Sequence, residues 1–84
     1  MSKTTQKELA TELAKQLRLE PQQHSLSGFA EACFNDCSLA ELVEAYQRDS
    51  ADETDCKAWQ MTAEQSRAAI AHALEFALFL AITE

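Results

Sequence analysis

Residues 62–82 read TAEQSRAAIAHALEFALFLAI, and this stretch decides the fold class. Thr62 and Gln65 form a capping-box pattern, in which each side chain satisfies a backbone donor at the start of a helix. Apolar residues then recur at helical spacing as far as Ile82. We therefore predict a helix over residues 63–82, about 30 Å long, which is the longest element expected in the chain.

The second half of this helix changes character. Every residue from Phe76 to Ile82 is apolar, and a helix that is apolar all round has to be covered on all sides. A membrane span needs about 20 such residues, whereas His72 and Glu75 interrupt the apolar stretch that begins at Ala68. The pattern favours burial in a homo-oligomer or against a partner over a membrane span. We expect a homodimer, with an interface made of Phe76, Phe79, Leu80 and Ile82.

The remainder of the chain also predicts helices. One glycine and one proline in 84 residues leave few of the residues that tight β-turns need. Thr5 with Glu8 and Ser38 with Glu41 are further capping-box patterns, Pro21 should stop the first helix, and Ser25 is a candidate N-cap. The prediction is an all-α bundle of four to five helices in one domain (1–84), with helices at about 5–19, 26–34, 39–49 and 63–82 and a short turn at 55–60.

Acidic residues are concentrated in the middle of the chain. Residues 31–55 carry eight carboxylates against Arg48 alone, a net charge of −7 that equals the charge of the whole chain. Such asymmetry can be a solvated helix face and loop, or it can steer a basic partner toward the protein. We take the second interpretation and assign the partner-binding surface to Glu41, Glu44, Asp49, Asp52, Glu53 and Asp55.

The charge of residues 26–49 does not favour direct contact with nucleic acid. Residues 26–49 resemble a helix-turn-helix superficially, but the second helix would present Glu41 and Glu44, which repel phosphates. Direct DNA binding is therefore not expected. Mimicry of nucleic acid, with carboxylates in the place of phosphates, is one form of the acidic-surface hypothesis.

Other chemistry has little support in the sequence. Cys33 and Cys37 share helical spacing and could join Cys56 and a histidine in a zinc site, but we expect a helix break at Asn35 and buried thiols instead. No phosphate loop or nucleophile elbow is present, and the acidic loop lacks the glycine of an EF-hand. We expect no enzyme activity, no metal and no cofactor, and we expect Trp59 to plug the core, with a partner-facing anchor as the alternative.

The location follows from the N-terminus and the cysteines. The first eight residues, MSKTTQKE, contain no apolar core of a signal peptide. Three cysteines, an odd number, fit a reducing compartment better than a disulfide framework. A cytoplasmic protein is expected.

The stretch DETDCKAWQMTAEQ, residues 52–65, resembles a segment of short uncharacterised helical proteins of bacterial phages and conjugative elements. The shared pattern is an acidic pair followed by Cys56, Trp59, Thr62 and Gln65 ahead of an alanine-rich helix. The resemblance implies an accessory protein of a mobile element. Such proteins commonly bind and disable host defence machinery, as anti-CRISPR and anti-restriction proteins do.

The leading hypothesis is thus a non-enzymatic acidic inhibitor or adaptor that docks on a basic surface of a host protein complex. The alternative is a small regulatory or antitoxin-like subunit that binds its partner through the apolar C-terminal helix. A zinc- or thiol-dependent helical module is a third possibility.

Overall fold

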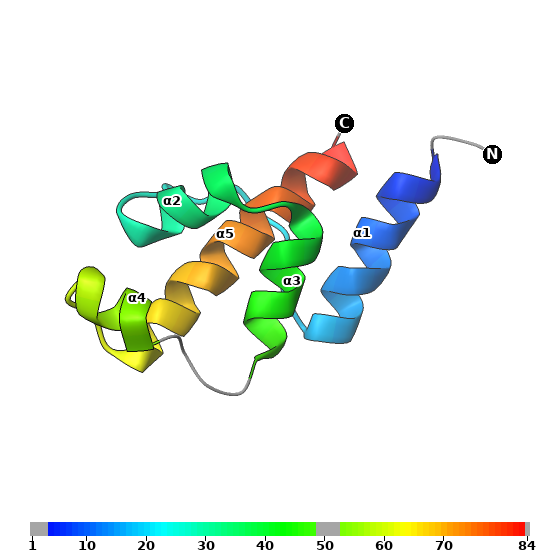
Figure 1. The fold of residues 1–84 in the computed structure, drawn as a ribbon. Coiled ribbons are helices and arrows are strands. Elements are labelled where there is room, and N and C mark those ends of the chain that lie inside the picture. The colour runs from blue at the N-terminus through cyan, green and yellow to red at the C-terminus, as the bar shows by residue number, and fades with distance from the viewer. Residues whose placement is uncertain (1–3, 49–52, 84) are drawn as a thin grey trace.

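The computed structural model of the chain describes residues 4–48 and 53–83. Within these ranges the protein is helical and contains no strand, which confirms the predicted all-α class. The helices are α1 (Thr4–Leu17), α2 (Phe29–Asp36), α3 (Leu39–Gln47), α4 (Glu53–Ala58) and α5 (Ala63–Thr83), shown in Figure 1.

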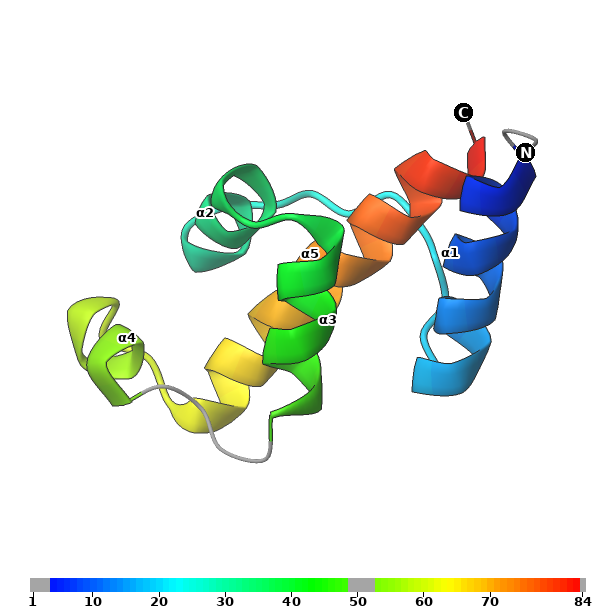
Figure 2. The same ribbon diagram turned by 45° about the vertical axis from the view of Figure 1, so that its right-hand side comes forward.

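Helix α5 is the element on which the other helices assemble. Each of α1, α2, α3 and α4 packs against it, so that α5 runs through the molecule from α4 at its first turns to α1 at its last turns (Figures 1 and 2). The molecule is elongated, with principal extents of 43 × 24 × 19 Å. This arrangement supplies, within one chain, much of the cover that an apolar helix needs.

The core lies where α1 and α3 meet the middle of α5. Leu74 and Leu78 of α5 and Leu42 of α3 are the large side chains at its centre, and none is more than 1% exposed. From α1 the core receives the small residues Ala10 and Ala14, which lie one helical turn apart and allow the two backbones to approach closely.

Two helices end in the same backbone motif without glycine. Arg18 follows α1 and Gln60 follows α4, and both have the positive φ of the left-handed region, 58° and 52°. In each case two backbone N–H groups bond back to the last turn: Leu19 N to Ala14 O and Arg18 N to Lys15 O in α1, with equivalent bonds after α4. This is the Schellman arrangement, and it ends α1 at Leu17. The helix therefore ends four residues before Pro21, which we expected to stop it.

The start of α2 differs from the prediction. The helix begins at Phe29 rather than near Leu26, and its N-cap is Gly28 rather than Ser25. Gly28 has φ 59° and ψ −131°, a conformation that residues with a Cβ rarely adopt. The chain therefore cannot continue a helix through Gly28, and α2 instead extends at its other end through Asn35 to Asp36.

The capping boxes of α3 and α5 are confirmed. Ser38 N donates to Glu41 Oε1 at 2.8 Å while Glu41 N donates to Ser38 Oγ at 3.2 Å. Thr62 N donates to Gln65 Oε1 at 2.9 Å and Gln65 N to Thr62 Oγ1 at 3.0 Å. Helix α1 begins at Thr4, one residue before the predicted cap Thr5, whose side chain lies outside the described part. α4 occupies the place of the predicted turn.

The central position of α5 predicts where truncation is costly. Leu74→Ala should lower the free energy of unfolding by about 3 kcal/mol, since a fully buried leucine leaves a cavity. Leu80→Ala on the same helix should cost less than about 1 kcal/mol, because Leu80 is 40% exposed. Urea denaturation followed by far-ultraviolet circular dichroism measures both changes, and equal losses would show that the helix is not buried as described.

Candidate functional site

A groove opens between α2, α3, α4 and the first half of α5. Its volume is about 230 Å³, and Glu41 and Glu44 of α3 and Asp55 of α4 are among its lining residues. Three members of the predicted acidic surface are thus brought to one groove, although α3 and α4 are separate along the chain. We refer to it below as the acidic groove.

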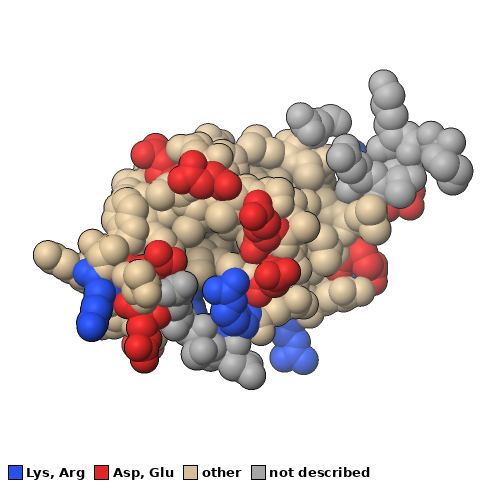
Figure 3. Space-filling model, viewed as in Figure 1, with Lys and Arg blue, Asp and Glu red and all other residues tan. Residues whose placement is uncertain are grey.

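The other members of the predicted surface have different positions. Glu53 is exposed on the first turn of α4 and is not among the lining residues of the acidic groove. Asp49 and Asp52 lie outside the described residues. Figure 3 shows carboxylates distributed over the face formed by α2, α3 and α4, with lysine and arginine side chains along its lower edge.

Glu41 has a structural role as well as a place in the groove. Its carboxylate accepts the Ser38 backbone N–H in the capping box, and this hydrogen bond, together with that to the Ser38 side chain, lowers the pKa of Glu41. The carboxylate is exposed, so it stays ionised and available to a partner at neutral pH. A substitution at Glu41 therefore changes both the charge of the groove and the start of α3.

Two arginines make the groove less acidic than the sequence suggests. Arg48 and Arg67 both line it. The Arg67 guanidinium donates from Nη1 to the carbonyl oxygen of Arg48 at 2.6 Å and from Nη2 to that of Tyr46 at 3.4 Å, and it lies 5.8 Å from the centre of the Tyr46 ring. A cation at the C-terminal end of α3 satisfies its last carbonyls, so Arg67 ties α3 to α5.

Cys33 and Cys37 line the same groove as free thiols. The helix break that we expected at Asn35 is wrong: α2 continues to Asp36 and Cys37 is its C-cap. Burial, followed by the nearby charges of Cys37, Asp55 and Asp36, raises the pKa of Cys33 from 9.0 to about 11. Burial also raises the pKa of Cys37. Both thiols are protonated at neutral pH, which is unfavourable for metal ligation or redox exchange.

Trp59 does not plug the core. Its side chain is 46% exposed and packs edge-on against Phe29, with 5.7 Å between ring centroids and 61° between ring planes. Phe29 lines the acidic groove, so Trp59 lies beside the carboxylates with much of its ring open to solvent. This position agrees with the alternative of a partner-facing anchor.

A second groove lies on the other side of α3, between α1 and the last turns of α5. Its volume is about 550 Å³, and it is lined by apolar residues alone: Leu9, Ala10, Leu13, Phe34, Leu39, Ala40, Ala77, Leu80 and Ala81. Leu9 is 58% and Leu80 40% exposed. We refer to it as the apolar groove.

The residues assigned to a dimer interface are partly covered within the chain. Phe76 stacks on Phe34 of α2, with ring centroids 4.9 Å apart and 11° between ring planes. Ile82 packs against the core, and Phe79 is half-buried, so that Leu80 is the exposed member of the set.

Helix α5 has the length and composition of a membrane span, as core helices of soluble proteins also do. The cellular location of the protein therefore stays a prediction.

The structure also joins three residues that the sequence did not link. His24, in the connection between α1 and α2, lies against α5, where its Nε2 is 2.7 Å from Glu75 Oε1. The His24 and His72 rings are stacked, with 4.5 Å between centroids and 21° between planes. The only signal in the sequence was that His72 and Glu75 interrupt an apolar helix at a spacing of three residues, which places them on one face.

Comparison of the chain with protein-family models, curated proteins and solved structures finds no match. The features of the described residues that bear on binding are the two grooves and the exposed Trp59.

The raised pKa of Cys33 predicts slow alkylation. At pH 9 its thiolate fraction should be about fiftyfold below that of an ordinary thiol. Iodoacetamide labelling, followed by mass spectrometry of the Cys33 peptide, should show a rate that rises about tenfold from pH 9 to 10 and about fivefold from pH 10 to 11 in the folded protein. In urea, the labelling rate of the same peptide should level off above about pH 9. Identical pH profiles in the two states would contradict the burial of this thiol.

The same shift affects stability. The folded state keeps a proton on Cys33 that the unfolded chain loses above about pH 9. The contribution of this thiol to stability is therefore complete below that pH and is lost as the pH rises toward 11.

Proposed function

We propose that this protein is a non-catalytic binding protein that docks the face formed by α3 and α4 on a basic surface of another protein. The observation that carries the proposal is the convergence of Glu41, Glu44 and Asp55 on one groove, next to an exposed tryptophan. Glu53 extends the acidic surface on the outer side of α4.

The two kinds of residue would contribute differently to binding. Exposed carboxylates attract a lysine- or arginine-rich surface and raise the association rate, an effect that salt screens. Tryptophan buries a large area on association and is enriched among the residues that dominate binding energy. An acidic surface beside an aromatic anchor therefore suits a partner with cationic side chains around an apolar pocket.

The class of partner comes from the resemblance of residues 52–65 to proteins of phages and conjugative elements. That segment comprises α4, Trp59 and the capping box of α5, which is the region beside the acidic groove. We therefore propose a mobile-element inhibitor or adaptor of the anti-CRISPR or anti-restriction type. Its target would be a nucleic-acid-binding complex of the host, since such complexes expose basic surfaces.

The charge of this face provides the first test. Glu44→Lys combined with Glu53→Lys reverses two exposed carboxylates without removing the Glu41 cap. The matched control, Glu8→Lys with Glu12→Lys, makes the same change in charge on the exposed face of α1. A partner captured from a bacterial lysate at low salt is identified, purified and titrated by calorimetry against all three proteins.

The wild-type affinity should fall as salt increases, and the α3–α4 variant should bind about tenfold more weakly or worse. The α1 control should bind like the wild type. Equal affinities for the α3–α4 variant and the wild type, or equal losses in both variants, would refute docking through this face.

The apolar groove favours a second candidate. A small regulatory or antitoxin-like subunit would bind a partner or a second copy of itself there, since an apolar groove is a common receptor for an amphipathic helix. Of the four residues expected at the interface, Leu80 lines this groove, together with Ala77 and Ala81 of the same helix.

Oligomeric state tests this candidate. If the protein is a homodimer through the apolar groove, Leu80→Glu should shift it to monomer in sedimentation velocity, because a buried unpaired carboxylate is costly. Ala58→Glu, a change on the exposed surface of α4, should leave the dimer intact. A wild-type monomer at all concentrations, or a Leu80→Glu dimer, would exclude a homodimer through this groove.

A further inference from the structure

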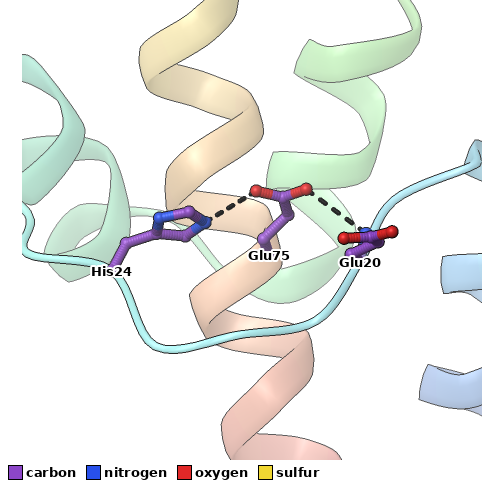
Figure 4. Close-up of polar contacts among 3 residues, drawn as sticks. All are labelled: Glu20, His24 and Glu75. Carbon is purple, nitrogen blue, oxygen red and sulfur yellow. Dashed lines mark hydrogen bonds and ion pairs between the residues drawn. The ribbon is translucent and has the colours of Figure 1, made fainter.

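Helix α5 contains a polar pair in its apolar half, and the pair has a partner from another segment. Between residues 68 and 82 all residues except His72 and Glu75 are apolar. The connection between α1 and α2 crosses this part of α5 and brings His24 to both of them, as Figure 4 shows for His24 and Glu75. None of the three residues lines the acidic or the apolar groove.

We propose that His24, His72 and Glu75 bind one Zn²⁺ ion, a site that is independent of the proposed docking function and departs from our expectation of no metal. Each residue offers one ligand atom, and these atoms lie within 4.8 Å of one another. Ligand atoms in a tetrahedral zinc site are about 3.3 Å apart, given bond lengths near 2 Å. The two imidazole rings are stacked, so one ring has to rotate out of the stack for a nitrogen of each ring to point at the same ion as the Glu75 carboxylate.

The hydrogen bonds around Glu75 orient its carboxylate. Oε2 accepts the backbone N–H of Glu20 at 3.3 Å, whereas Oε1 faces His24 Nε2 at 2.7 Å (Figure 4). Without metal, an N–H at His24 Nε2 donates to Oε1 of the carboxylate; Zn²⁺ would take the place of this proton, which would be released to solvent. The bond from Glu20 would remain as the outer-shell contact that holds a ligating carboxylate in position.

The donor set selects the class of metal. Two imidazole nitrogens and one carboxylate oxygen suit zinc and its transition-metal neighbours, whereas Mg²⁺ and Ca²⁺ prefer sets of oxygen ligands. Three protein ligands leave a fourth position for water. Since the His72 side chain is exposed, the site is open to exchange with solvent.

Zinc at this position would stabilise the fold. It would join the α1–α2 connection to the helix on which every other helix packs, and a metal that binds only the folded state stabilises it by mass action. The bound ion would therefore oppose detachment of α1 from α5.

Calorimetric titration of Zn²⁺ into untagged, chelator-treated protein at about pH 7.5, where imidazole is mostly neutral, tests the proposal. The chain has only two histidines, so a purification tag must be absent. His72→Ala removes one ligand but leaves the His24–Glu75 hydrogen bond, and Glu75→Gln removes the carboxylate charge at nearly constant shape. Glu64→Gln, an exposed change on the same helix, is the matched control.

We expect one ion per wild-type chain, affinity reduced about tenfold or more in His72→Ala and Glu75→Gln, and no change in Glu64→Gln. Zinc should raise the thermal midpoint of the wild type by several degrees but not that of His72→Ala. Co²⁺ as a spectroscopic substitute should give visible ligand-field bands without a thiolate charge-transfer band. Absence of binding, unchanged affinity in His72→Ala, an unchanged midpoint or a thiolate band would overturn the proposal.

Discussion

The structure depends on one constraint: α5 is too apolar to be left uncovered. Leu74 and Leu78 are completely buried, and each of the other helices packs on α5. The second half of α5 has apolar residues on every side, and such a helix needs cover on more than one face; Leu80 remains 40% exposed. Short amphipathic helices can each cover only one strip. Several of them, joined by connections that cross α5, are therefore needed within the chain. The alanines of α1 and α5 also allow these two helices to approach closely near the C-terminal end of α5.

The same constraint places the two candidate binding surfaces. Helix α3 covers the middle of α5 with Leu42 and leaves a groove on each side, one with Glu41 and Glu44 in its lining and one with Leu39 and Ala40. Arg67 holds α3 in place by capping its C-terminal carbonyls from α5, and the Ser38–Glu41 box holds its other end. The charged and apolar surfaces are therefore built from the same packing contact, and a change in the position of α3 would alter both.

His72 and Glu75 are the polar residues within the apolar stretch 68–82 of α5, and the α1–α2 connection brings His24 to both of them. A polar side chain on a covered helix needs a partner, since an unsatisfied buried group is costly. His24 supplies one to the half-buried Glu75 through a hydrogen bond, and it stacks on His72, whose side chain is exposed to solvent. The arrangement gives Glu75 a partner without metal, and it also collects the ligand atoms that zinc prefers, so that zinc binding would exchange this hydrogen bond for bonds to the ion.

The sequence alone determined the all-α class, the length of α5 and the capping boxes of α3 and α5, because these features depend on residues three or four positions apart. It also located the acidic block, of which Glu41, Glu44 and Asp55 reach one groove. Tertiary structure decided the rest: α2 begins only after Gly28, which has a positive φ, Trp59 lies at the surface, and His24 meets Glu75 across 51 positions of the chain. These outcomes depend on how helices dock and on the path of the connections between them, and local spacing carries no information on either.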